Sequence, residues 1–175
     1  MLRKFFTKKR IYILIFLWLL VNTAFNFGPW SISALKAISG GVGIPDLMLS
    51  YDLEKLSSIF AAFGAEGMAI YRKIQILDYI YPLIYGALLL GLLARLKIPT
   101  NFRSIYAFPF VTVFMDYSEN IIFGVLMNHY PNFTAHDEHL ANLAALCTNL
   151  KWSFLSLVIL NIIGFWIWNL IKKRN

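Results

Sequence analysis

Two carboxyl groups and an amide lie within one helical turn of each other in the stretch VFMDYSENII, residues 113–122. They belong to Asp116, Glu119 and Asn120, and the surrounding run, residues 104–127, is otherwise apolar. A carboxylate at membrane depth costs several kcal/mol unless a cation pairs with it or a proton neutralises it. Two adjacent carboxyl groups at low dielectric rarely both ionise. One protonated acid beside one ionised acid suits proton transfer, and it also suits the binding of a cation or an amine.

Other apolar runs carry polar residues that suit the same chemistry. Asp78 lies in the first turn of one run, and Pro82 and Tyr85 follow four and seven residues later, on the same face of a helix. Thr148 and Lys151 lie in the last apolar run. The candidate catalytic residues are Asp78, Asp116, Glu119 and Lys151. The candidate ligand-binding residues from this reasoning are Tyr85, Asn120 and Thr148.

The composition indicates that lipid surrounds much of the chain. Of its 175 residues, 59% are hydrophobic and 14% are charged, and the mean hydropathy is +0.63. A soluble domain is about half apolar and about a quarter charged. The length corresponds to one domain. Cys147 is the single cysteine, which excludes an intrachain disulfide and a multi-cysteine metal site.

Four segments are long and apolar enough to cross a bilayer, which needs about 20 largely apolar residues. They are residues 11–27, 76–96, 104–127 and 143–171. Between the first two, residues 52–72 have apolar side chains at helical spacing and charged side chains on the other faces. This pattern predicts an amphipathic interfacial helix in a long outer loop, with Gly64 as the position where it would break, and the helix either braces the bundle or covers it as a lid. The predicted fold is an all-α integral membrane four-helix bundle, a single transmembrane domain over residues 1–175.

Basic residues are concentrated in three segments that contain no acid. Residues 1–10, 95–103 and 172–174 hold eleven of the sixteen Lys and Arg residues. They precede the first span, connect the second to the third and follow the fourth, so the positive-inside rule places both termini in the cytoplasm. In a bacterial cell this membrane would be the inner membrane. The net charge of +7 is then a topology signal that also favours anionic headgroups, and no nucleic-acid partner is expected.

With this orientation, every span brings its polar residues to the outer half of the bundle. Glu119 lies about one turn closer to the outside than Asp116, and Lys151 lies about 12 Å into the fourth span at 1.5 Å per residue. Arg72 and Lys73 could reach down from the outer loop. The shared depth predicts a polar pocket that opens to the outer side. The alternative is a hydrogen-bonded network that only holds the helices together.

The three histidines belong to the second outer loop, NHYPNFTAHDEHL. His136 and His139 are separated by Asp137 and Glu138, so this loop could hold a metal. The spacing matches no strong signature, and we interpret the segment as a solvated loop. No nucleotide or cofactor motif is present in the sequence, and we predict neither a metal nor a cofactor.

A combination of motifs resembles a family of small, uncharacterised four-span membrane proteins, mainly bacterial. The family pattern is G-x-x-G-(R)-x-x-Y before the second span, D-x-x-x-P-x-x-Y within it, D-x-x-E-N in the third and T-x-x-K-W in the fourth. The resemblance covers residues 44–155 and departs at Met68, where the family has arginine. It implies a four-span fold and a site that includes Tyr71 as a further ligand-binding candidate, but no activity. The matching positions are Gly64, Gly67 and Tyr71; Asp78, Pro82 and Tyr85; Asp116, Glu119 and Asn120; and Thr148, Lys151 and Trp152.

The architecture is also similar to that of the sterol isomerase and sigma-2 receptor group. That group has a long first outer loop, intramembrane acids and a proline in the second span. Its first-span acid is missing here, where Asn22 and Asn26 occupy the corresponding region. The likeness is architectural, and we use it as an analogy.

Three functions fit these observations. The first is an intramembrane pocket that binds a lipid-soluble small molecule or acts on it by acid–base chemistry. The second is a proton- or cation-linked carrier, and the third is an accessory protein whose polar cluster specifies only packing. We favour the first, with the lipid bilayer and a lipophilic small molecule as partners. The sequence determines neither whether the protein is an enzyme nor its oligomeric state.

Overall fold

The computed structural model describes residues 2–174, and these residues form helices and connecting segments without strands. The all-α fold class is therefore confirmed for this part of the chain. The helices are α1 (Leu2–Phe5), α2 (Lys8–Asn26), α3 (Ile32–Ile38), η1 (Pro45–Leu47), α4 (Leu53–Asp78), α5 (Tyr81–Arg95), η2 (Thr100–Ala107), α6 (Phe108–His129) and α7 (Ala135–Arg174).

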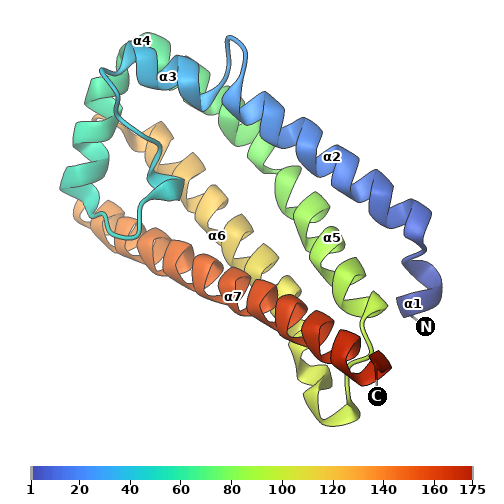
Figure 1. Cartoon of the computed structure of the whole chain (residues 1–175). Helices are drawn as coiled ribbons and strands as arrows, with labels where there is room; N and C mark the ends of the chain where they lie inside the picture. The colour runs from blue at the N-terminus through green and yellow to red at the C-terminus, as the bar shows by residue number, and fades with distance from the viewer. Residues whose placement is uncertain (1, 175) are drawn as a thin grey trace.

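Four helical segments are long and apolar enough to cross a membrane, as is typical of a polytopic membrane protein. They are Lys8–Asn26, Leu53–Arg95, Thr100–His129 and Ala135–Lys172, and each overlaps one predicted span. The start of α1, the α5–α6 connection and the end of α7 lie together at one end of the bundle, which we call the terminal end (Figure 1). The opposite end, formed by α3, α4 and the α6–α7 connection, is the loop end.

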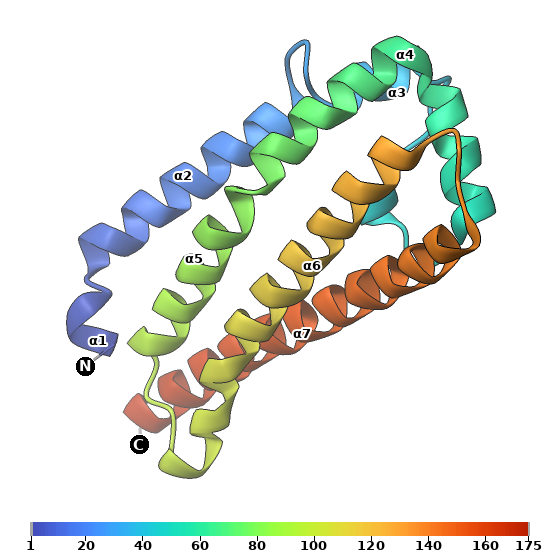
Figure 2. The same ribbon diagram turned by 180° about the vertical axis from the view of Figure 1, so that it is seen from behind.

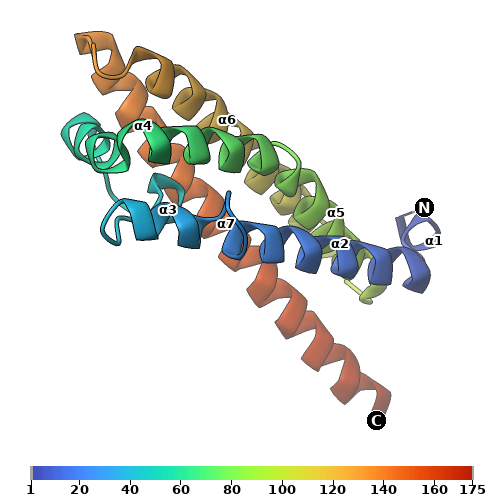
Figure 3. The same cartoon turned by 90° about the horizontal axis from the view of Figure 1, so that it is seen from above.

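Helices α2, α5, α6 and α7 pack as neighbours in a row rather than as a closed ring. The most extensive contacts join α6 to α7 and α2 to α5, and α5 also packs on α6. Helices α2 and α7 therefore lie at opposite edges, with α5 and α6 between them (Figures 1 and 2). Viewed from above, α3 lies beside α4 at the loop end (Figure 3). This arrangement leaves room between the two edge helices, where side chains of both line one cavity.

The connection between α3 and α4 folds back into that room. We call residues 44–52 of this connection the inner segment, and Ile44, Pro45 and Asp46 within it are buried. Side chains of α7 hold the segment: the Trp152 indole donates to the carbonyl of Asp46 (3.2 Å), and the Asn149 amide donates to that of Leu49 (2.9 Å). The long loop therefore contributes to the interior of the bundle.

Helix α4 bends at Gly64, where φ is 60° and ψ is −171°. Only glycine adopts this conformation at low cost, so the bend depends on its missing side chain. The apolar face before the bend, Leu56, Phe60 and Phe63, is at most 1% exposed and belongs to the main hydrophobic core. The helix that was predicted over residues 52–72 thus extends to Asp78, and its apolar face packs on protein.

The helical hydrogen bonding is interrupted at Tyr79 and Ile80, between α4 and α5, although both residues keep helical backbone angles. Proline at position 82 causes this break because it lacks the N–H that would bond to the carbonyl of Asp78. The Asn120 amide of α6 donates to that carbonyl instead (3.2 Å). Asp78 is therefore the last residue of α4 and Tyr85 lies on α5, but the backbone angles between the two helices stay helical, and both side chains line one cavity, as their spacing predicted.

Candidate functional site

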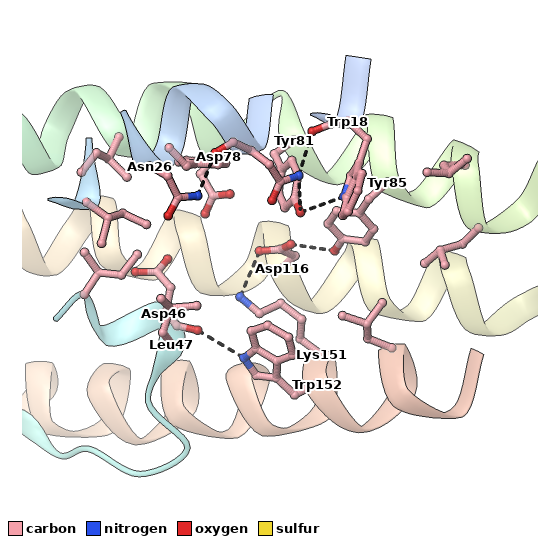
Figure 4. A pocket seen from close by; sticks show the side chains of 18 of the residues that line it. Trp18, Asn26, Asp46, Leu47, Asp78, Tyr81, Tyr85, Asp116, Lys151 and Trp152 are labelled. Atoms are coloured by element: carbon pink, nitrogen blue, oxygen red, sulfur yellow. Dashed lines mark hydrogen bonds and ion pairs between the residues drawn. The ribbon is translucent and has the colours of Figure 1, made fainter. Parts of the chain in front are cut away.

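A cavity of about 480 Å³ lies between the edge helices, and residues from α2, α3, the inner segment, α4, α5, α6 and α7 line it. Most of its wall is apolar or aromatic. The charged residues that line it are Asp46, Asp78, Asp116 and Lys151, which come from four different elements (Figure 4).

One lysine contacts two carboxyl groups at the wall of this cavity. Lys151 Nζ lies 3.3 Å from Asp116 Oδ1 and also bonds to Glu119 Oε2. The exposed fractions of Lys151, Asp116 and Glu119 are 7%, 3% and 0%. Because one cation balances only one of the two acids, the cluster either carries a negative charge or holds a proton. Buried charges of this kind persist only with close partners.

Hydrogen bonds extend this cluster in both directions. Tyr85, which lines the cavity, donates to Asp116 Oδ2 (2.6 Å). On the other side, the Thr148 hydroxyl donates to Glu119 Oε1 (2.5 Å) and lies 2.8 Å from the Tyr51 hydroxyl. Proton-bearing groups thus form one connected chain from the cavity into the core. The members in order are Tyr85, Asp116, Lys151, Glu119, Thr148 and Tyr51.

Asp46 of the inner segment is a cavity residue that the sequence reasoning missed. Its side chain is 6% exposed, and Tyr71 donates to its Oδ2 atom (2.9 Å). Burial raises the pKa of the Asp46 carboxyl, although nearby Lys151 and the Tyr71 hydrogen bond offset part of that rise. Asp46 lies in a loop, where no periodic pattern in the sequence could indicate which side chains are buried. The loop folds inward because of its contacts with α7.

Asp78 presents a carboxyl group to the cavity from the last residue of α4. No described residue forms a hydrogen bond with its carboxyl oxygens; only its backbone carbonyl is bonded, to Asn120. The Oδ1 atom of Asn120 is buried and has no hydrogen-bond partner among the described residues, and the same is true of Gln75 Oε1. Figure 4 shows the carboxyl groups of Asp46 and Asp78 pointing into the space between α4 and the inner segment.

The wall of α2 contributes two amides and an indole. The Asn22 amide donates to the carbonyl of Trp18 (2.7 Å), and the Asn26 amide donates to that of Asn22 (2.8 Å). The Trp18 indole donates to the hydroxyl of Tyr81 on α5 (3.1 Å). Asn22, Asn26, Trp18 and Tyr81 all line the cavity.

The predicted site residues divide into two groups. Those that line the cavity are Asp78, Tyr85, Asp116 and Lys151. The others lie behind its wall, within the hydrogen-bonded network: Tyr71, Glu119, Asn120 and Thr148. Trp152, which the T-x-x-K-W motif includes, lines the cavity and donates to the backbone of Asp46. Trp18 and Tyr81 were also missed, because aromatic residues in apolar runs carry no distinguishing pattern.

Two basic residues lie elsewhere than the sequence reasoning placed them. Arg72 donates to the carbonyl of Met127 (3.1 Å) and to Asn128 Oδ1 (2.8 Å). Lys73 Nζ lies over the ring of Trp30, 4.0 Å from its centroid. Neither lines the cavity, so the expectation that they reach down into the site was wrong.

The histidine loop forms a helix start rather than a cluster of ligands. Asp137 Oδ2 accepts from the backbone N–H of Thr134 (2.7 Å), and Asp137 Oδ1 contacts His129 Nδ1 (2.6 Å). These bonds cap the first turn of α7. Within residues 2–174, no group of three or more His, Cys, Asp or Glu side chains is placed to hold a metal ion.

No known protein-family model, curated protein or solved structure matches this chain. The geometry of the cavity is therefore the basis for assigning a function. It places the Tyr85 hydroxyl, the Asp116 carboxyl group and the Lys151 ammonium group at a mostly apolar wall, with the Glu119 carboxyl group directly behind. Groups of these types at hydrogen-bond distance can donate, accept and pass on protons.

Proposed function

We propose that this protein binds a lipid-soluble small molecule in the cavity and acts on it by acid–base chemistry. The observation that carries the proposal is the apolar cavity of about 480 Å³ with a few convergent charged groups. Ligand pockets for small molecules typically have volumes of about 300–1,000 Å³ and this mixture of apolar wall and sparse polar groups.

In the proposed reaction, Asp116 and Tyr85 exchange a proton with the bound molecule. Both line the cavity, and their side chains are hydrogen-bonded to each other. Lys151, which also lines the cavity, stabilises the resulting charge by its contact with Asp116, and Glu119 supports Lys151 from behind the wall. Thr148 orients the Glu119 carboxyl group by donating to it.

We further propose that the four long helices span a membrane with the terminal end in the cytoplasm. The basic residues at that end include Arg10, Arg95, Arg103 and Lys172, whereas Asp52, Glu54, Glu66 and Glu138 belong to elements of the loop end. The positive-inside rule then places the cavity in the outer half of the membrane, the inner membrane if the cell is bacterial. We also propose that the chain belongs to the family of small four-span proteins. Part of α4 would then lie at the outer surface of the membrane.

This topology has a direct test with reporters. A reporter inserted near Lys97 or fused after Arg174 should report the cytoplasm, and one at Ser39 should report the outside, because only the first two positions belong to basic segments. Alkaline phosphatase and a fluorescent protein can serve as the complementary pair. A cytoplasmic signal at Ser39 would contradict the four-span topology and the depth assigned to the cavity.

A proton- or cation-linked carrier is the second candidate function. The excess of acids over the single lysine favours it, because Asp46, Asp78 and Asp116 line the same cavity as Lys151. Ionisable residues at membrane depth commonly mark ion and proton pathways. A carrier would move its cation without altering a lipid-soluble molecule, so analysis of the bound molecules separates the two functions.

The function is tested by a pair of tryptophan substitutions on α7. Leu155 lines the cavity, whereas Leu157 does not and is 43% exposed, so Leu155→Trp fills the cavity and Leu157→Trp is its matched control. Lipid-soluble molecules that copurify with each protein are measured by mass spectrometry. We expect Leu155→Trp to retain at least about tenfold less of the ligand than the other proteins, because lost cavity contacts weaken binding. Identical extracts from all three proteins would contradict the proposal.

The chemical step is tested by Glu119→Gln, which keeps the shape of the side chain and removes its charge. If Glu119 supports acid–base chemistry, the variant should fold, bind and accumulate the unconverted molecule in cells, as lipid analysis would show. If the cluster only holds helices together, the variant should be as functional and at least as stable as the parent, because an expensive buried carboxyl group has been removed. That second result would favour an accessory role.

A further inference from the structure

One end of the cavity offers hydrogen-bond acceptors and almost no donors. We call it the acceptor end and define it by the side chains of Asn22, Asn26, Asp46 and Asp78, all of which line the cavity. The carboxyl oxygens of Asp78 form no hydrogen bond with a described residue, and Asp46 uses only Oδ2, which accepts from Tyr71. Three carboxyl oxygens are therefore available to a ligand.

Few donors of this end are free. The Asn22 amide donates to the carbonyl of Trp18 and to the Tyr81 hydroxyl (3.4 Å), whereas the Asn26 amide uses one of its two N–H groups, so one amide N–H and two Oδ1 acceptors remain. Lys151, the one cationic residue among the described residues that line the cavity, bonds to Asp116 and Glu119. The Tyr81 hydroxyl accepts from Trp18 and Asn22 and keeps a single proton to donate. Because the acceptors outnumber the free donors, a ligand at the acceptor end must supply N–H or O–H groups of its own.

The charge at this end favours a cation over a neutral donor. Asp46 is 94% buried, since its exposed fraction is 6%, and the nearby positive charge of Lys151 is shared between two other acids. Aromatic rings of Trp18, Phe25 and Trp152 also line the cavity, and such rings attract cations through their faces. A metal ion fits poorly, because residues 2–174 contain no cluster of metal-ligating side chains.

The remainder of the cavity fits an aliphatic body that comes from the lipid. Leu88, Leu89 and Leu155 line it, and so do Leu47 and Ile159, whose exposed fractions are 55% and 43%. These two exposed side chains show that the cavity opens at the surface beside the inner segment and α7. The surface of α7 around this opening is itself apolar, so a ligand would reach it through lipid rather than through water.

We propose that the ligand is an amphiphilic amine whose protonated nitrogen donates N–H bonds to Asp46 and Asp78 and whose aliphatic body lies against α5 and α7. The inference rests on the proposed function, because it names the ligand class of the same cavity. A quaternary ammonium ion is excluded as a good ligand, since it has charge but no N–H group to satisfy the free carboxyl oxygens.

The experiment compares three probes with the same twelve-carbon chain on the purified full-length protein in detergent. Dodecylamine has charge and N–H donors, dodecyltrimethylammonium has charge alone, and dodecanol has neither charge nor N–H. Binding is followed by the fluorescence of tryptophan, since Trp18 and Trp152 line the cavity. We expect dodecylamine to bind at least about tenfold more tightly than either of the others, because charge-assisted hydrogen bonds are the strong ones.

Three variants test where in the cavity the amine group binds. Asp78→Asn should weaken dodecylamine at least about tenfold and leave dodecanol unchanged, because only the charged contact is removed. Glu66→Gln removes the same charge from an exposed position of the same helix, α4, and should change neither probe. Leu155→Trp should weaken all three probes. The probe series on the unmodified protein remains decisive if Asp78→Asn does not fold.

The outcomes separate this inference from the proposed function. If none of the three probes bound to the parent protein or to Leu155→Trp, the proposed function itself would be overturned. Dodecanol that binds as tightly as dodecylamine, with no effect of Asp78→Asn, would keep a lipophile site and overturn the amine. Equal binding of dodecylamine and dodecyltrimethylammonium would overturn the role of N–H donation to Asp46 and Asp78.

Discussion

Replacing Lys151 with methionine should destabilise the folded protein by about 3–5 kcal/mol, as removal of one partner from a buried ion pair typically does. Methionine retains much of the lysine's length and removes its charge. Asp116 and Glu119, at 3% and 0% exposed, then lose their shared cation within the bundle. The measurement is unfolding in detergent. The matched control is Lys55→Met, which removes an exposed lysine of α4 and should change stability by less than about 0.5 kcal/mol.

A double-mutant cycle shows whether the two charges share a site. Asp116→Asn in the Lys151→Met background should recover part of the lost stability, because it removes a carboxyl group that no longer has a cation. We expect a coupling energy of about 0.5–3 kcal/mol between the two positions, the range found for residues in one ion-pair network. Strictly additive effects of the two substitutions would mean that α6 and α7 do not bring these residues together, and the cavity would have to be abandoned as a site.

The second large effect is expected from Phe123→Ala on α6. The Phe123 side chain is fully buried, and its ring centroid lies 5.7 Å from that of Tyr51 in the inner segment. Truncation of a buried phenylalanine costs about 3–5 kcal/mol, because apolar burial is lost and a void remains. Since the void opens beneath the inner segment, hydrogen exchange at residues 44–52 should rise more than elsewhere. Unfolding in detergent and hydrogen exchange by mass spectrometry measure the two effects.

Phe114→Ala is the control for that experiment. Phe114 lies on the same helix but is 65% exposed, so its truncation removes little protein packing and should cost well under about 1 kcal/mol. If Phe123→Ala raised exchange equally throughout the molecule, the inner segment would not depend on α6 for its position. The placement of Asp46 by that packing would then be contradicted.

Local patterns in the sequence were sufficient to predict the long helices. Continuous apolar runs over residues 11–27 and 104–127 are long enough to cross a bilayer, and both lie largely within single helices of the structure. The same reasoning placed Asp116 and Glu119 at a depth comparable with that of Lys151. The structure brings these three residues into contact, because a buried carboxyl group in an apolar run must find a cation or a donor nearby.

Positions that depend on interrupted helices were less predictable. The sequence predicted that Asp78 lies in the first turn of the second span. In the structure Asp78 is the last residue of α4, because Pro82 interrupts the helical hydrogen bonding, and α5 begins at Tyr81. The two halves of α4 change direction at Gly64, the position where the sequence suggested a break in this helix. The backbone angles at Tyr79 and Ile80 nevertheless stay helical, so Asp78 and Tyr85 line the same cavity despite the interruption, as their spacing predicted.

The sequence by itself thus determined which four segments are helical, long and apolar enough for a membrane, and which of them carry acids at comparable depth. Those properties depend on residues close together in the chain. Only the tertiary structure decided that Asp46 faces the same cavity as Asp78, because the inner segment is held there by Asn149 and Trp152 of α7, about a hundred residues away. Contacts between segments so distant in the chain have no local periodicity. The charged lining of the cavity therefore follows from how the helices and the inner segment pack, and no single motif encodes it.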